Sequence, residues 1–243
     1  MNLVLDIGNT FCKICVFDCN KLIYKDLAKS SNSEILLKTF EIFKVQDIKS
    51  VIISSVNSKV SVEEELKKKC SNVLVFNSLT PIPVKNLYST PKTLGLDRLA
   101  ASVGAFDLFE KKNCLIIDAG TAITYDFLNS CGEFLGGNIA PGIRLRFSSL
   151  NEHTSKLPLI EDFSWGGEFG NDTFSAVSNG VLNGLLFEIE GYTKRFEDKY
   201  PDGKIILTGG DTIFLSKKLK NTIFAEPNLV AIGLNRILNY NVF

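Results

Sequence analysis

The sequence predicts an α/β protein built from two duplicated domains that face each other across a nucleotide cleft. The main observation is a repeat: an apolar run ends in an aspartate and a glycine turn at Leu3–Thr10 and again, about 112 positions later, at Leu115–Ala122. In each copy a buried strand delivers a carboxylate to its carboxyl end, and the glycine lets the backbone turn sharply. Small hydroxyl or amide residues follow, so the N–H groups of the turn stay open to an anion. Two such turns indicate a kinase-like arrangement.

A single turn of this kind would have an ordinary explanation. Asp-x-Gly-Asn-Thr also fits a hairpin turn, which commonly contains Asn-Gly or a similar pair. Hairpin geometry does not, however, require the aspartate that ends both strands, Asp6 and Asp118. Each copy is also followed by a second strand-like run, at 11–17 and 123–128. We therefore prefer duplicated phosphate turns to two unrelated hairpins.

The composition fits a globular protein with one large domain or two domains of about 120 residues each. Of the 243 residues, 27 are Lys or Arg and 27 are Asp or Glu, and this neutral balance disfavours nucleic-acid binding, which usually needs a basic excess. No signal peptide is visible, and no apolar run approaches the ~18 residues needed to span a bilayer, so we expect a cytoplasmic protein without a membrane partner. Cys12 and Cys15 are interpreted as strand residues in a reducing compartment, because no second pair completes a zinc site.

The first half reads as a three-strand meander followed by alternating helices and strands, which indicates a mixed sheet. We expect strands within 3–27, at 50–55 and at 73–76, and helices at 33–44 and 62–69. The stretch 80–93 contains three prolines and is expected to be a loop at the active site. It leads into Gly95–Arg98, which opens a helix that runs to about Lys112.

The second half repeats this order, with strands at 114–118, 122–128, 131–139 and 204–207 and helices at 144–152, 172–196, 212–218 and 227–239. We therefore expect the domains to cover residues 1–112 and 113–243. The helix over 172–196 carries a wide apolar stripe made of Phe174, Val177, Val181, Leu182, Leu185, Leu186, Ile189, Tyr192 and Phe196. This width favours a homodimer interface on the second domain, and the alternative is an entirely intramolecular core.

The two strand-ending aspartates suit phosphoryl transfer. That reaction needs cations that bridge the β- and γ-phosphates, and hard carboxylate oxygens hold such cations. Asp6 and Asp118 would supply those oxygens if the two copies are related by a pseudo-twofold. Lys13 could add a point charge, although a solvated strand lysine is an equally good explanation.

A second constellation is Gly95-Leu96-Asp97-Arg98. An aspartate is a credible base for an alcohol that loses its proton as it attacks phosphorus. The fork of Arg98 suits a carboxylate or phosphate group. Taken alone, Asp97 and Arg98 more often form a charge pair at a helix start. The glycine pair in Thr208–Asp211 suits close backbone approach to a nucleoside, or simply a tight strand-to-helix turn.

Six motifs in this order resemble the type III pantothenate kinases, bacterial enzymes of the acetate and sugar kinase/Hsc70/actin superfamily. They are Asp6–Thr10, Gly95–Arg98, Asp118–Ala122, Gly136–Gly142, Asn171–Thr173 and Thr208–Gly210. The resemblance covers essentially the whole chain. It implies two ribonuclease H-like domains and ATP-dependent phosphorylation of pantothenate to 4′-phosphopantothenate, the first step of coenzyme A synthesis.

The resemblance also implies roles for individual residues. Asp97 would be the catalytic proton acceptor, and Asp118 would bind a monovalent cation, potassium or ammonium. ATP, with magnesium, would be bound by Asp6, Ile7, Gly8, Asn9, Thr10, Phe11, Cys12, Lys13 and Thr121. Pantothenate would contact Tyr88, Gly95, Leu96, Asp97, Arg98 and Thr173. Members of the family are homodimers.

Two other functions are compatible with parts of this pattern. The family includes relatives named Bvg accessory factors for a role in transcription, so a non-catalytic regulator is the alternative. A regulator could have lost the base or the cation aspartate, yet Asp97 and Asp118 are both present. An actin- or Hsp70-like ATPase, with water as acceptor, would need subdomain insertions for which 243 residues leave no room.

Overall fold

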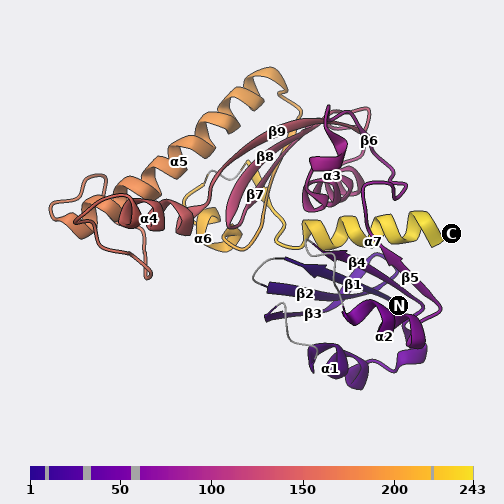
Figure 1. The fold of residues 1–243 in the computed structure, drawn as a ribbon. Coiled ribbons are helices and arrows are strands. Elements are labelled where there is room, and N and C mark those ends of the chain that lie inside the picture. Colours follow the sequence, from indigo (N-terminus) through magenta and orange to yellow (C-terminus); the bar gives the residue numbers. More distant parts are fainter. Residues whose placement is uncertain (9–10, 30–33, 56–60, 220–221, 243) are drawn as a thin grey trace. The chain divides into compact units, whose positions relative to one another are not determined.

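The computed structural model describes residues 1–8, 11–29, 34–55, 61–219 and 222–242, which form two compact units (Figure 1). The first unit comprises Met1–Glu110, Gly132–Phe134 and Asn228–Phe243, and the second comprises Lys111–Cys131 and Leu135–Pro227. The expected domain division between residues 112 and 113 stays a prediction. The compact units differ from it in that the last helix joins the first unit.

The first unit contains a five-stranded mixed sheet in the order β3-β2-β1-β4-β5. Its central strand β1 (Asn2–Ile7) pairs antiparallel with β2 (Phe11–Asp18) and parallel with β4 (Ser50–Ser55). The outer strands are β3 (Lys21–Lys29) and β5 (Asn72–Val75). The predicted three-strand meander is thereby confirmed, and the sheet becomes parallel beyond it.

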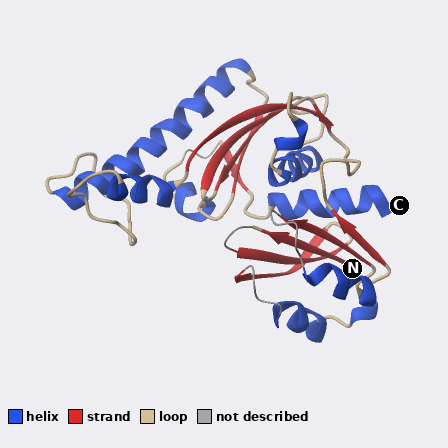
Figure 2. Ribbon diagram, in the orientation of Figure 1, coloured by secondary structure: helices blue, strands red, loops and turns tan. Residues whose placement is uncertain are grey.

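Helices cover both faces of this sheet (Figure 2). On one face lie α1 (Glu34–Ile42) and α2 (Ser61–Lys69), and on the other lies α7 (Leu229–Val242), against which α3 (Leu96–Leu108) packs. The unit also contains the short strand β6 (Lys85–Asn86) and the 3₁₀ turns Val45–Asp47 and Pro91–Thr93.

The alternation of side chains along β1 decides which face each residue meets. Leu3 and Leu5 belong to the core cluster that includes α1 and α2. Asn2, one position out of phase, instead donates from Nδ2 to Oδ1 of Asn235 on α7 at 2.9 Å. Asp6 shares the parity of Asn2, so it lies on the face covered by α7 and α3.

The second unit repeats the strand order of the first. Its strands follow the order β11-β10-β7-β8-β9, with β6 pairing onto the start of β9. The bounds are β7 (Cys114–Ala119), β8 (Ala122–Leu128), β9 (Glu133–Pro141), β10 (Lys204–Thr208) and β11 (Ile223–Ala225). As in the first unit, the central strand pairs antiparallel with the next strand and parallel with a later one. The duplication read from the sequence is therefore a duplication of topology.

The helices of the second unit are α4 (Ile143–Glu152), the long α5 (Thr173–Lys199) and the short α6 (Thr212–Ser216). Alternate residues of β7, Leu115 and Ile117, pack in one core cluster with Leu182 and Ile189 of α5, so α5 covers one face of the sheet (Figure 1). Asp118 is out of phase with that set and lies on the opposite face.

Most helix and strand bounds differ from the predicted ones by a few residues, and two strands were not predicted. The third helix ends at Leu108 rather than near Lys112, and the last helix begins at Leu229. The missed strands, β6 and β11, have two and three residues and exist through their pairing with neighbours.

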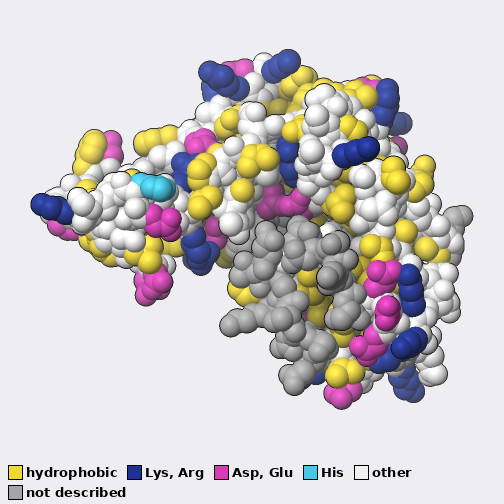
Figure 3. Space-filling view, viewed as in Figure 1, with side chains coloured by type: hydrophobic (Ala, Val, Ile, Leu, Met, Phe, Trp, Pro, Cys, Tyr) yellow, Lys and Arg dark blue, Asp and Glu magenta, His cyan; other side chains and the backbone are white. Residues whose placement is uncertain are grey.

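None of the helices in the described part of the chain is long and apolar enough to cross a membrane. His153, the single histidine, follows the end of α4 and is exposed, as the cyan side chain in Figure 3 shows.

Candidate active site

The first phosphate turn follows β1. The N–H of Gly8 donates to the carbonyl oxygen of Phe11 at 3.0 Å, which links the end of β1 to the start of β2. A Cβ on Gly8 would lie 3.3 Å from that same oxygen, so a larger residue would crowd the turn. Ile7 is buried, whereas Phe11 is 48% exposed. Asn9 and Thr10, two of the predicted ATP contacts, lie outside the described residues.

Asp6 lies next to two other charged residues of the predicted site. It is the cross-strand partner of Lys13 on β2. Burial raises the pKa of Asp6 to about 6; the Lys13 ammonium acts in the opposite direction, and the Asp97 carboxylate raises the pKa further. A repulsion of this kind requires the two carboxylates to be near each other. The first unit thus brings the predicted phosphate-turn carboxylate and the predicted base to one place.

Asp97 occupies the first turn of α3, and Gly95 is the N-cap residue of that helix. Oδ1 of Asp97 accepts a hydrogen bond from the backbone N–H of Arg98 at 2.9 Å, and the Asp97 side chain is exposed. The positive end of the helix dipole favours a carboxylate there. A Cβ on Gly95 would come within 2.4 Å of this Oδ1, so the glycine leaves the carboxylate its room.

Arg98 is 6% exposed and held by aromatic rings. Its guanidinium carbon lies 5.6 Å from the ring centre of Tyr88 and 5.8 Å from that of Phe134, within the range of cation–π attraction. The backbone N–H of Tyr88 is fixed by a 2.9 Å bond to Oδ1 of Asn86. Tyr88 was predicted as a site residue and Phe134 was not, because a lone apolar residue in a strand carries no signal for such a role.

The second unit assembles its glycine turns around Asp118. Asp118 is opposite Thr208 on the parallel neighbour β10, and Gly209, which follows it, has a left-handed φ of 95°. A Cβ on Gly209 would lie 2.4 Å from Oδ1 of Asp118. Gly120 closes the β7–β8 turn by donating to Ala122 at 3.1 Å. The motifs at 118–122 and 208–210, about 90 positions apart, are therefore neighbours in space.

The third glycine motif, at 136–142, reaches the same turn. The N–H of Gly142 donates to the carbonyl oxygen of Thr121 at 3.1 Å, and a Cβ on Gly142 would lie 2.1 Å from the carbonyl oxygen of Gly120. Thr121 itself is exposed. Beside the turn, Asp211 lies 3.6 Å from Arg144; burial raises the pKa of Asp211 and Arg144 partly offsets that rise.

Thr173, a predicted pantothenate contact, is the first residue of α5, an element that contributes none of these turns. The helix start is fixed by a capping box, in which Asp172 accepts from the N–H of Ser175 at 3.0 Å and the Ser175 hydroxyl accepts from the N–H of Asp172. Thr173 and the neighbouring Phe174 are exposed.

The apolar stripe of α5 is mostly intramolecular core. Its width therefore does not indicate a dimer interface, contrary to the expectation from the sequence. Six of its members are buried, and Leu186 and Tyr192 pack partly buried against the same cluster. The six are Val177, Val181, Leu182, Leu185, Ile189 and Phe196. Only Phe174, at 53% exposure, points away from this core.

Among the described residues, no group of three or more His, Cys, Asp or Glu side chains could hold a metal ion. Magnesium usually binds through one or two carboxylates together with substrate phosphates. The site in the first unit, where the partly exposed Asp6 feels a second carboxylate, fits that kind of binding and does not form a cage made of protein ligands alone.

Residues 2–195 match the family model described as type III pantothenate kinase. A type III pantothenate kinase of Bacteroides fragilis is 42% identical over 241 residues, covering 99% of this chain and 98% of the relative. One from Christiangramia forsetii is 42% identical over 245 residues, covering 99% of each chain.

Among solved structures, a Campylobacter jejuni protein described as a candidate Baf family transcriptional activator aligns with a TM-score of 0.63 and 24% identity, covering 98% of both chains. A Listeria monocytogenes protein described as a candidate N-acetylmannosamine kinase aligns with a TM-score of 0.51 and 16% identity, also covering 98% of both chains. Both likenesses concern the fold, and they confirm an α/β fold of two ribonuclease H-like domains.

Proposed function

The chain belongs to the type III pantothenate kinase family, and we propose that it phosphorylates pantothenate with ATP to give 4′-phosphopantothenate. The observation that carries this proposal is the extent of the family match. Residues 2–195 contain the whole of the predicted site, from Asp6 to Thr173. The chain is accordingly a kinase, a transferase that acts on an alcohol group, and its product enters coenzyme A synthesis.

The first unit supplies the groups that phosphoryl transfer needs. The turn after β1 offers the Gly8 region to phosphate oxygens, with Asn9 and Thr10 as further proposed ATP contacts, and Lys13 adds a positive charge beside Asp6. When bound, magnesium would offset the charge of the β- and γ-phosphates, and Asp6 is the residue of this turn suited to hold it. The repulsion by the Asp97 carboxylate, which contributes to the raised pKa of Asp6, supports a phosphate and an acceptor hydroxyl meeting here.

Asp97 is proposed as the general base. Its exposed carboxylate, oriented by the Arg98 N–H, can take the proton from the pantothenate hydroxyl as that oxygen attacks phosphorus. Arg98 is proposed to bind the substrate carboxylate, because a guanidinium shielded from water and held between aromatic rings is well suited to a planar anion.

A coupled assay with ATP, magnesium, potassium and pantothenate tests the proposal. Wild-type protein should turn over, and Asp97→Asn, which keeps the shape but cannot accept the proton, should lower kcat by about 10²–10⁴-fold. The matched control is Asp107→Asn on the same helix, where the aspartate pairs with Arg236 at 3.2 Å. If Asp97→Asn keeps more than about a tenth of wild-type turnover, Asp97 is not the base.

We further propose that Asp118 binds potassium or ammonium. Asp118, the residue before the last of β7, lies beside the Gly209 turn on the sheet face opposite the α5 core, where its carboxylate is suited to a monovalent cation. Activity should fall when sodium replaces potassium, and Asp118→Asn should abolish that difference. Equal activity in sodium-only buffer would remove the assignment.

A homodimer is proposed on the family's habit, supported by exposed apolar residues on the second unit. Phe174 and Phe187 of α5 are 53% and 64% exposed. Sedimentation at micromolar concentration should give a dimer of this 26.9 kDa chain. A monomer that phosphorylates pantothenate would show that the dimer is dispensable.

The regulatory alternative is not favoured. The Baf family protein shares 24% sequence identity with this chain, and that likeness concerns the fold. A regulator without catalysis would also have no use for an oriented carboxylate at Asp97 near Asp6.

A further inference from the structure

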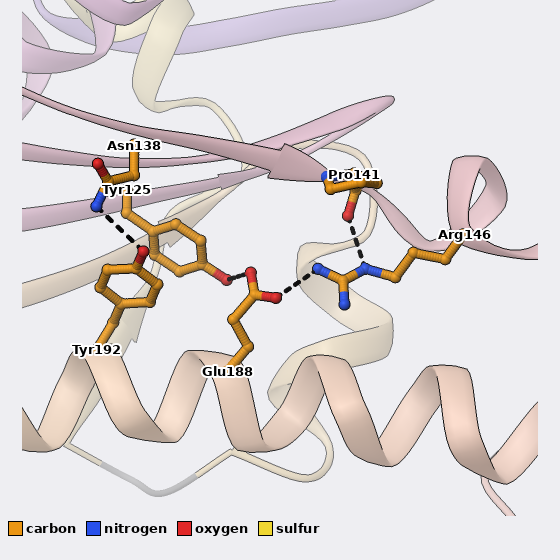
Figure 4. Close-up of polar contacts among 6 residues, drawn as sticks. All are labelled: Tyr125, Asn138, Pro141, Arg146, Glu188 and Tyr192. Atoms are coloured by element: carbon orange, nitrogen blue, oxygen red, sulfur yellow. Dashed lines mark hydrogen bonds and ion pairs between the residues drawn. The ribbon is translucent and has the colours of Figure 1, made fainter. Parts of the chain in front are cut away.

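One carboxylate of the second unit holds three elements together (Figure 4). Oε1 of Glu188, on α5, accepts a hydrogen bond from the Tyr125 hydroxyl of β8 at 2.8 Å. Its Oε2 lies 2.6 Å from the guanidinium of Arg146 on α4. The side chains of Arg146 and Glu188 are 20% and 27% exposed, so the pair is shielded from water on most sides. Both carboxylate oxygens are therefore engaged in charge-assisted bonds.

The tyrosine side of this network is rigid. Tyr125 is buried and stacks on Tyr192, with ring centres 3.9 Å apart, and the Tyr192 hydroxyl accepts from Nδ2 of Asn138 at 3.1 Å. Burial first, and then Glu188, raises the pKa of Tyr125 far above its ordinary value. Tyr125 consequently remains a hydrogen-bond donor to Glu188 throughout the usual pH range.

The arginine side leads to the glycine turns. Nε of Arg146 donates to the carbonyl oxygen of Pro141, the last residue of β9, at 2.8 Å. The next residue, Gly142, donates its N–H to Thr121 and approaches the Gly120 carbonyl so closely that a Cβ there would lie 2.1 Å away. A displacement of Pro141 would therefore be transmitted directly to the turn at Gly120 and Thr121.

An ion pair so shielded is a poor device for stability alone. Each ion loses hydration, and well-packed apolar side chains of the same volume often stabilise a protein as much or more. Such a pair does, however, fix the relative orientation of the groups that it joins. The guanidinium fork of Arg146 bonds a carboxylate and a carbonyl at once and so fixes one relative to the other.

We propose that Glu188 is a positioning residue for nucleotide binding: by holding Arg146 against Pro141 it fixes the Gly142 contact and with it the turn at Gly120 and Thr121. This inference rests on the proposed function, in which Thr121 contacts ATP. Glu188 itself touches neither substrate.

The test compares Glu188→Gln and Arg146→Lys with wild type. The amide keeps the shape of Glu188 without its charge, and the lysine keeps the charge of Arg146 without its fork. Both variants should weaken binding of a non-hydrolysable ATP analogue, measured by calorimetry, by roughly ten- to a hundredfold, because small misplacements of binding groups have effects of that size. The KM for ATP should rise in parallel, while the KM for pantothenate changes less than about twofold.

Lys194→Met is the matched control, because it removes an exposed ion pair with Asp198 from the same helix. It should leave nucleotide affinity unchanged. The double variant Glu188→Gln/Arg146→Lys should bind the analogue no more weakly than the single variant with the lower affinity. The effects of residues that act through one contact are not additive.

Two results would overturn the inference: single variants that bind the analogue as tightly as wild type, or effects that simply add in the double variant. A rise in both KM values together with a fall in kcat and in Tm would likewise assign Glu188 to stability alone. Failure of the proposed function is a separate result, namely wild-type protein that does not turn over pantothenate. The calorimetric comparison of variant and wild-type nucleotide affinity uses no pantothenate, so its outcome does not depend on pantothenate being the substrate.

Discussion

The crossing of α3 and α7 depends on two glycines, and Gly233→Ala should disrupt it. A Cβ on Gly233 would lie 1.8 Å from the carbonyl oxygen of Ala100, 2.7 Å from its carbonyl carbon and 2.9 Å from the backbone nitrogen of Gly104. All three atoms belong to backbone, so no side-chain rotation can relieve the overlap. The helices must separate, or one must shift along the other.

The magnitude follows from that overlap. Ordinary contacts begin near 3.4 Å, so the helices must move apart by about 1.6 Å at this point. Overpacking of a close-packed interior typically costs ~1–3 kcal/mol, and a backbone clash belongs at the upper end. Alanine regains ~1 kcal/mol through its higher helix propensity. We expect a net loss of about 2 kcal/mol in the free energy of unfolding.

Urea denaturation measures this loss, with Gly191→Ala as the matched control. Gly191 lies within α5 and a Cβ there would meet nothing within 4 Å, so the control should be more stable than wild type by ~0.5–1 kcal/mol. If Gly233→Ala is as stable as wild type while Gly191→Ala behaves as expected, α3 and α7 do not cross as closely as described.

Three further outcomes follow from the same contacts. Gly95→Ala should lower kcat about tenfold or more with little change in Tm, because its Cβ would push the Asp97 carboxylate off the Arg98 N–H; an unchanged kcat would refute the oriented carboxylate. Asp6→Asn should alter the pH dependence of stability in metal-free buffer. The raised pKa means that the folded protein keeps a proton which the unfolded chain has released, so wild-type stability should fall by on the order of 2 kcal/mol as pH rises from about 4 to 7. The variant should lack this slope, and parallel slopes of the two proteins in urea melts would contradict the prediction. Gly209→Ala should lower the free energy of unfolding by ~1–3 kcal/mol, because φ is 95° there and the neighbouring turn leaves no room; wild-type stability would show that the turn can relax.

Patterns within a few residues of each other were enough to predict the strand-ending carboxylates. An apolar run followed by Asp and Gly predicted the ends of β1 and β7, because strand burial and the glycine turn are both local properties. The sequence order of the elements similarly predicted two copies of one α/β unit, and the two sheets have matching strand orders.

The apolar stripe of α5 shows where such reasoning fails. Periodicity reveals that a helix face is apolar, but the same face can pack on its own sheet or on a second chain. Leu182 and Ile189 pack on β7 of the same unit, which only the tertiary structure decides. Phe134 beside Arg98 was missed for a related reason, since the two residues lie far apart in sequence and meet only in the folded chain.

The sequence by itself determined the duplicated α/β architecture, the two aspartate turns and the family, since these depend on short motifs and their order. Only the tertiary structure decided how distant segments combine. It assigns α7 to the first unit, where Gly233 meets Ala100 and Asn235 bonds Asn2. It also joins Glu188 to the Gly142 turn through Arg146. Apart from the bond between Arg146 and Pro141, these contacts link residues about 40 to 230 positions apart, and their existence depends on close packing and directional hydrogen bonds that no local pattern encodes.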